Sequence, residues 1–196
     1  RWEAAIAAYL SAKQWDAAVG LIVQHAQKLL AQGRCEQVVE WINALLLAEP
    51  AQRQNAWLMY WLGVAQSYGQ EDAARENIAA AHTAFAADAN RDGCVTAATA
   101  MLCAMSRSWA SLRDVGHWYD AAVEAYSPDM VFTDADGELM VLTGLLFGQV
   151  LSGRQFDHHE MAIERITALQ DTAADINMRL MSVAAAFRSM RRLCSR

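Results

Sequence analysis

The chain has 196 residues and a formal net charge of -6, with 16 Lys and Arg against 22 Asp and Glu. Hydrophobic residues make up 55% of it, which allows a large core and argues against disorder. The 39 Ala and 19 Leu outnumber the 10 Gly and 2 Pro, which favours helices and excludes collagen-like chains, small disulfide scaffolds and most all-β folds. The acidic balance argues against direct nucleic-acid binding, which needs a basic face.

The sequence also predicts where the chain resides. It opens without a secretory leader pattern, and its longest apolar run, 56–65, is shorter than the about 20 residues that span a membrane. Four cysteines lie far apart without a CxxC pair, at positions 35, 94, 103 and 194. We expect reduced, buried thiols in a cytoplasmic protein with no membrane contact. Because the first residue is Arg1, we also expect a piece of a longer, multidomain protein.

Taken in chain order, the first half predicts five helices. Apolar residues at helical spacing, such as Leu21, Ile22 and Leu29 around His25, give each helix one apolar face. We expect His25 to be a core histidine with its hydrogen bonds satisfied. Glycines and a proline separate the helices, which are expected over residues 3–12, 15–32, 35–47, 52–68 and 71–87.

The second half continues in the same way. Polar loops are expected at 88–93 and 127–137, and Gly153 opens a short turn. No segment alternates with period two for long enough to predict a strand. The expected helices cover residues 94–108, 112–126, 138–151, 157–171 and 173–193.

Some helix pairs repeat a pattern of close crossings. Gly63 is followed by Ala74 and Ile78, an arrangement that resembles the tetratricopeptide repeat, in which a small residue lets two helices approach. Trp15, Ala18 and Ile22 repeat it weakly, and a third version combines Phe147 and Gly148 with Phe156, Ala162 and Ile166. We therefore predict an all-α fold over 1–196, a single domain forming a tetratricopeptide-like right-handed superhelix of antiparallel helix hairpins with about ten helices. A generic α-bundle is the alternative.

Three stretches carry a family resemblance: WDAAVGLIVQHAQKLLAQGRCEQVVEWINAL, WLMYWLGVAQSYGQEDAARENIAAAHTAFAADANRDG and DTAADINMRLMSVAAAF. They resemble the helical-repeat region of MalT-type, LuxR-like, ATP-dependent transcriptional regulators. The chain lacks their P-loop and an identifiable helix-turn-helix, so the resemblance extends only to the middle, sensor or scaffold part. It implies signal transduction and transcription regulation, and a domain of the kind that senses a small oligosaccharide.

Aromatic residues are the candidate binding residues. Trp57, Tyr60 and Trp61 are within one turn of each other, and Trp109 and Trp118 follow later. At helical spacing such residues are usually core. The functional alternative is a concave wall that offers flat apolar faces to a sugar, a peptide or another ligand.

Polar clusters give weaker candidates, and we expect no catalytic residues, metal or cofactor. Residues 88–93 fit the first half of a calcium loop, but Thr99 replaces its final bidentate Glu, so a polar loop with Asp92 capping the next helix is favoured. His158 and His159 are adjacent and cannot share one metal from a regular helix, so a solvated first turn is expected. Residues 134–138 are interpreted as the start of a helix.

Three functions remain. The first is a non-enzymatic sensor or interaction module that binds an effector or partner on a concave face; the second is a self-association or protein–protein scaffold without a small ligand; the third is a small helical enzyme. The partners would be other proteins, flanking domains or a second copy. A polar pocket around the aromatics favours the first, and a broad apolar patch favours the second. A distant acid or Cys near Asp157 and His158 favours the third. The basic C-terminal end, with Arg188, Arg191, Arg192 and Arg196, is interpreted as a dipole-favoured helix end or a docking edge.

Overall fold

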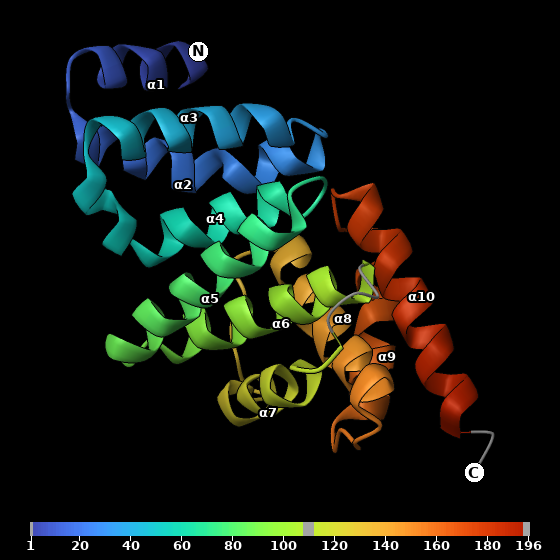
Figure 1. The fold of residues 1–196 in the computed structure, drawn as a ribbon. Coiled ribbons are helices and arrows are strands. Elements are labelled where there is room, and N and C mark those ends of the chain that lie inside the picture. The colour runs from blue at the N-terminus through green and yellow to red at the C-terminus, as the bar shows by residue number, and fades with distance from the viewer. Residues whose placement is uncertain (1, 108–111, 194–196) are drawn as a thin grey trace. The chain divides into compact units, whose positions relative to one another are not determined.

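The computed structural model describes residues 2–107 and 112–193, with side chains as far as 190. Within these residues the chain forms ten α-helices, one 3-10 helix and no strand (Figure 1). The expected all-α fold with about ten helices is confirmed. The elements are α1 (Trp2–Ser11), α2 (Trp15–Ala31), α3 (Cys35–Ala48), η1 (Pro50–Gln54), α4 (Ala56–Gln66), α5 (Glu71–Ala87), α6 (Arg91–Arg107), α7 (Val115–Ala125), α8 (Ala135–Ser152), α9 (His159–Leu169) and α10 (Ile176–Leu193).

The chain divides into two compact units between Ala84 and Phe85, near the end of α5. In each unit the main contacts join helices that are adjacent or next but one in the chain, such as α2 with α3 and α4, or α8 with α9 and α10. A helical-repeat array has this local contact pattern. A single domain over 1–196 and a right-handed superhelix nevertheless stay predictions.

The first unit contains the helix crossing that the sequence predicted. Gly63 on α4 is buried, and a Cβ placed on it would lie 2.6 Å from Ile78 Cγ1 and 2.9 Å from the Ala74 carbonyl oxygen of α5. Ala74 and Ile78 are fully buried. Only a residue without a side chain allows this approach, so the sequence identified both the residue and its partners correctly.

The second unit is built around α8. Residues 141–149 are all buried, because α6, α7, α9 and α10 pack around this helix. A helix that is apolar on every side is stable only when it is surrounded in this way. Gly144 makes the closest crossing, since a Cβ there would lie 2.5 Å from the carbonyl oxygen of Thr99 on α6.

The third predicted crossing is wrong in its partner. A Cβ on Gly148 would meet Tyr119 Cδ2 at 2.5 Å and Leu102 Cδ1 at 2.8 Å, so this glycine faces α7 and α6. The sequence had paired it with Ala162 and Ile166 of α9. These two residues are buried on α9, which also packs against α8, but they are not the nearest neighbours of Gly148.

Side-chain caps set several of the helix starts that differ from the expectation. The helix expected from 94 begins at Arg91, because Asn90 Oδ1 accepts a hydrogen bond from the Gly93 amide at 2.9 Å; the expected cap at Asp92 is wrong. Asp134 accepts a hydrogen bond from the Gly137 amide at 2.8 Å and starts α8, as the sequence indicated for this segment. The helix expected over 52–68 begins only after Asn55, which caps α4.

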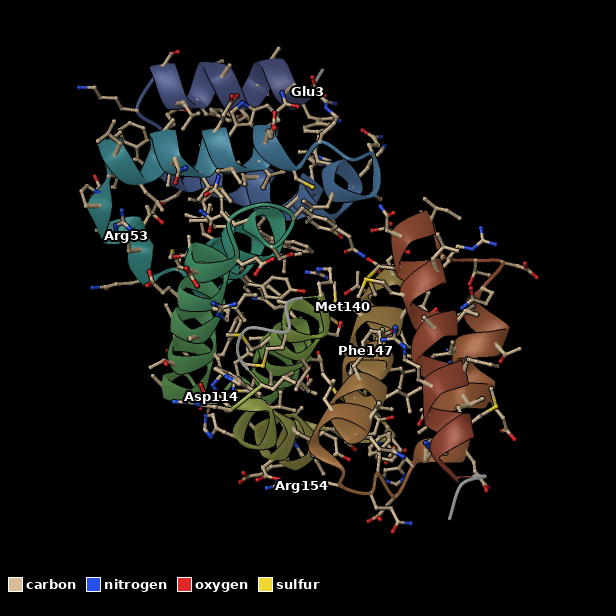
Figure 2. All side chains as sticks on the ribbon, turned by 45° about the vertical axis from the view of Figure 1, so that its right-hand side comes forward. Glu3, Arg53, Asp114, Met140, Phe147 and Arg154 are labelled. Atoms are coloured by element: carbon tan, nitrogen blue, oxygen red, sulfur yellow. The ribbon has the colours of Figure 1, made fainter. Side chains whose placement is uncertain are left out.

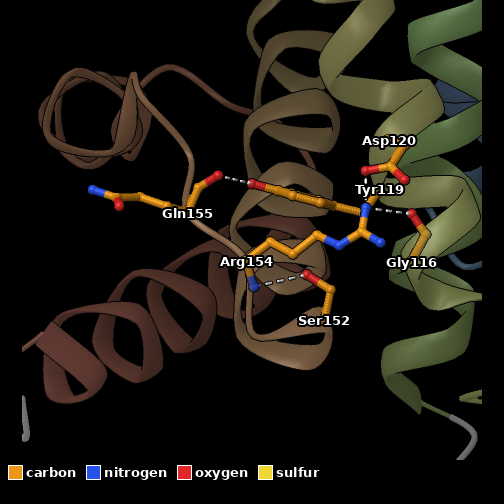
Figure 3. Close-up of polar contacts among 6 residues, drawn as sticks. All are labelled: Gly116, Tyr119, Asp120, Ser152, Arg154 and Gln155. Carbon is orange, nitrogen blue, oxygen red and sulfur yellow. Dashed lines mark hydrogen bonds and ion pairs between the residues drawn. The ribbon is translucent and has the colours of Figure 1, made fainter.

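Polar contacts hold the α8–α9 connection against α7 (Figure 3). The Arg154 guanidinium pairs with Asp120 and donates to the Gly116 carbonyl oxygen at 3.4 Å. The Tyr119 hydroxyl donates to the Gln155 carbonyl oxygen at 2.9 Å, and burial raises the pKa of this phenol to about 12. The connection that leads into α9 is therefore fixed at two neighbouring residues.

Candidate functional site

The last described helix is α10 (Figure 1), and among the described residues one of its apolar faces is left exposed. Five large side chains on it are 43–64% exposed, and we name them the α10 stripe: Ile176, Leu180, Val183, Phe187 and Met190. Their spacing of four, three, four and three residues is the spacing of the a and d positions in a coiled-coil heptad. The stripe is the longest run of exposed large hydrophobic residues on any one helix of the described chain.

The opposite face of α10 is buried and, apart from Met178, consists of small residues. It packs against α8 and α9 through Met178, Ser182, Ala185, Ala186 and Ser189. Short side chains let the helix axes approach closely, so the larger residues of α10 are left to face outward. The exposure of the stripe thus follows from the residue sizes on the two faces rather than from loose packing.

The start of α10 is fixed by Asp175. This buried residue accepts hydrogen bonds from the amides of Asn177 at 2.8 Å and Met178 at 3.3 Å. Its own amide donates to Asp136 Oδ1 of α8 at 3.0 Å. The helix therefore begins at Ile176, three residues after the expected Ala173.

Buried polar contacts fix how far α10 slides along its neighbours. His159 Nδ1 lies 3.0 Å from Ser189 Oγ and 3.1 Å from Gln149 Oε1 of α8. Gln170 Nε2 donates to Ser182 Oγ at 2.8 Å. A buried polar group that loses its hydrogen-bond partner destabilises the fold. These contacts therefore favour one position of α10 along α8 and α9, and they hold the stripe in place.

His159 corrects one expectation from the sequence. The expected solvated first turn holds for exposed His158, but His159 is only 7% exposed, and burial lowers the pKa of its ring. Its Nε2 is buried without a hydrogen-bond partner among the described residues. The nearby Ser189 is fully buried, so this serine–histidine pair cannot present a nucleophile to a substrate.

The charges on α10 are all positive. The segment from 176 to 193 contains four arginines and no Asp or Glu. Arg188 is exposed and its guanidinium carbon lies 6.0 Å from the Phe147 ring centre, on the side of α8 that faces α10 (Figure 2). Arg179 is half-buried beside Leu180, and its Nε is buried without a hydrogen-bond partner among the described residues.

The aromatic residues predicted as a binding wall have mixed positions. Tyr60 is 2% exposed and lies edge-on to both Trp57 and Trp61, with ring centres 5.6 Å and 4.8 Å away. Trp57 and Trp61 are half-buried, so only these two could offer part of a face to a ligand. Trp118 is 9% exposed and acts as core. Trp109 lies outside the described residues.

Two cavities of about 380 Å³ border other residues. One, in the first unit, lies beside Trp15 and Lys13, with Asp16, Glu49 and Gln52 in its wall. The other, in the second unit, is lined by residues 156–161 together with Gln149 and Gln155. Its acids and histidines all come from one short segment, so the distant acid or Cys that an enzyme interpretation required is absent from this described lining.

Metal and thiol chemistry adds no site. Among the described side chains, no three of His, Cys, Asp and Glu are grouped as metal ligands. Thr99, the last position of the possible calcium loop, is buried inside α6 and donates to the Val95 carbonyl oxygen at 2.7 Å. Cys103, Cys35 and Cys94 form no disulfide; Cys103 is buried, whereas Cys35 and Cys94 are half-buried, which corrects the expectation that they are buried. Cys194 lies outside the described residues.

Comparisons with known proteins show no family for this chain. No family model, no curated protein and no solved structure matches it. Among the described helices, none is both long and apolar enough to pass through a bilayer.

The α10 stripe was visible in the sequence but was not recognised. The spacing of Ile176, Leu180, Val183, Phe187 and Met190 can be read directly from the printed residues. The sequence, however, also places apolar Met178, Ala185 and Ala186 on another side of the same helix. Without the structure, nothing decides which of the two apolar faces is covered.

Proposed function

We propose that this chain is a non-enzymatic protein-interaction module whose α10 stripe docks an amphipathic helix of a partner. One observation carries the proposal: a rigidly held helix exposes five large apolar side chains in a heptad pattern. Amphipathic helices dock through such rows of anchors. Of the functions considered from the sequence, the scaffold without a small ligand is the one that an exposed apolar patch favours.

A narrow stripe suits a helix better than a membrane. At 100° per residue the five side chains fall within an arc of about 80°, whereas helices that face a core or a bilayer carry a wider apolar face. The row is also straight and about 21 Å long, from 1.5 Å of rise per residue over the segment from Ile176 to Met190. A second helix of three to four turns matches both dimensions.

The apolar contact alone supports a weak complex. Fully burying such a side chain yields about 1.5–3 kcal/mol, and these five are already about half buried, so docking returns roughly 4–8 kcal/mol. Association itself costs roughly 4 kcal/mol or more. The balance is at most about 4 kcal/mol, so we expect a dissociation constant in the millimolar range or weaker unless further contacts contribute.

A designed peptide tests this function. The probe has three heptads with Leu and Ile at a and d and Gln at e and g, carries a fluorophore, and is titrated with the whole chain while anisotropy is measured. We expect saturable binding that is lost in Leu180→Asp and in Phe187→Asp. Leu47→Asp is the matched control, since Leu47 is 86% exposed on α3, outside the stripe.

Two results would contradict the proposal. One is no binding of the Gln-flanked peptide up to about 10 mM, roughly ten times the dissociation constant expected from the apolar contact. The other is binding that Leu180→Asp and Leu47→Asp weaken equally, which would show nonspecific hydrophobic binding. Circular dichroism of each variant must first show an unchanged helix content, which we expect because all three positions are exposed.

The role in a transcription regulator and the oligosaccharide effector rest on the family resemblance alone. The open cavity beside Trp15 gives a small polar ligand one place to bind, since an indole and several charged groups line it. Tryptophan fluorescence of the whole chain against an oligosaccharide panel tests this second function. A saturable change that Trp15→Phe abolishes supports it, and the absence of any change refutes it.

A further inference from the structure

We infer that the α10 stripe docks a partner helix that carries acidic residues along its flanks; this inference rests on the proposed function. Two other occupants of the stripe compete with it: a second copy of this chain and an anionic membrane surface. The charges around the stripe separate the three.

The electrostatics of α10 call for an acidic partner. With Leu180 and Phe187 at a and Val183 at d, Arg179 takes a g position, so a cation borders the seam. No Asp or Glu lies between 176 and 193 to neutralise it. A helix with Glu or Asp on its own flanks would complement this border.

Arg179 strengthens this inference. Its side chain is half-buried, and its Nε has no hydrogen-bond partner among the described residues. No ion pair joins it to a described carboxylate, whereas Arg165, Arg154 and Arg34 each have one. A partly desolvated guanidinium without an acceptor gains more from an incoming carboxylate than a fully solvated one.

A second copy fits the same surface poorly. Two α10 helices paired through their stripes would leave Arg179 of each chain without a carboxylate at the seam, because the segment from 176 to 193 contains no Asp or Glu. The opposite charges at e and g positions that favour pairing in coiled coils are therefore missing from such a pair. The charges on α10 therefore favour a helix of opposite charge over a second α10.

A matched pair of peptides tests the charge of the partner. Both carry the Leu and Ile seam described above; one has Glu and the other Lys at every e and g position. We expect the whole chain to bind the Glu peptide at least about tenfold more tightly at low salt, and we expect 1 M salt, which shortens the Debye length to about 3 Å, to remove most of this preference. Arg179→Gln should narrow the preference, whereas Arg53→Gln, an exposed cation on η1, should not.

The possible results separate the two proposals. Failure of all three peptides, with Gln, Glu or Lys flanks, to bind refutes the proposed function itself. Binding of the Glu and Lys peptides with equal affinity leaves the proposed function in place and overturns the acidic partner. A dimer in light scattering that Leu180→Asp dissociates makes a second copy the occupant and overturns the inference. If the chain binds no peptide but sediments with vesicles of anionic phospholipid, and Leu180→Asp abolishes this sedimentation, a membrane is the occupant and the inference is overturned.

Discussion

The close crossing of α4 and α5 makes a sharp prediction about one methyl group. In Gly63→Ala the new Cβ would lie 2.6 Å from Ile78 Cγ1 and 2.9 Å from the Ala74 carbonyl oxygen. Carbon atoms pack at about 3.5–4.0 Å, so the two helices must separate or Ile78 must shift. Ile78 is fully buried, and the carbonyl oxygen is part of the backbone of α5, so neither can move aside easily.

The expected magnitude follows from two opposing effects. Overpacking a core costs typically about 1–3 kcal/mol and more where backbone must move, while Ala in place of Gly inside a helix returns up to about 1 kcal/mol. We expect Gly63→Ala to lower the free energy of unfolding by about 2 kcal/mol. Gly20→Ala provides the control: Gly20 is exposed inside α2 with nothing within 4 Å of its Cβ position, so this variant should gain about 0.5–1 kcal/mol.

Urea unfolding followed by circular dichroism at 222 nm measures both changes. The midpoint should fall for Gly63→Ala and rise for Gly20→Ala, relative to the unchanged chain. If Gly63→Ala is as stable as Gly20→Ala, α4 and α5 do not cross at this distance. The helix-crossing interpretation of the sequence would then fail together with the structure of this hairpin.

Three further predictions concern the second unit. Because burial lowers the pKa of His159, the folded chain binds a proton at this ring less readily than the unfolded chain. The free energy of unfolding should therefore stay level above about pH 6.5 and fall as the pH drops from there toward the lower native pKa. Urea titrations at several pH values measure this slope, and His159→Gln should flatten it. Asp134→Ala should lose about 1 kcal/mol, measured by thermal unfolding, because α8 loses its cap, whereas Asp129→Ala in the preceding loop should be neutral; equal losses would show that the cap carries no stability. The buried Cys103 thiol, with its pKa raised to about 12, should react with a thiol reagent more slowly than half-buried Cys35, and peptide mapping that finds the reverse order would contradict the packing of α6.

Local patterns in the sequence predicted local structure well. The spacing of apolar residues and the glycine stops located all ten described helices, since most of them bury one stripe. The crossing at Gly63 was predicted with its partners, because the three residues lie close together in the chain and a glycine among large residues indicates a near contact.

Contacts between distant helices were predicted poorly. Gly148 was paired with α9 but faces α6 and α7, and a helix that is apolar on every side gives no periodic signal that would choose among its neighbours. His159 was expected in solvent because its own helix turn is polar. Its burial depends on Ser189, which is 30 residues later in the chain.

The candidate site was missed for a related reason. The sequence directed attention to tryptophans, since large aromatic residues dominate binding surfaces. Tyr60 and Trp118 are core, whereas the longest exposed apolar row lies on α10, where Phe187 is the one aromatic residue among five. Exposure is a property of what the other helices leave uncovered, and it is decided by the small residues Ser182, Ala185 and Ser189 on the inner face of α10.

Chemical-shift mapping of the bound peptide tests the central claim most directly. The ¹⁵N-labelled chain is titrated with the Glu-flanked peptide, and amide shifts are followed residue by residue. We predict that the largest changes lie in the segment from Ile176 to Met190, and that they vanish in Leu180→Asp. Changes concentrated around Trp57 and Trp61, or no saturable change anywhere in the chain, would contradict the assignment of the α10 stripe as the docking surface.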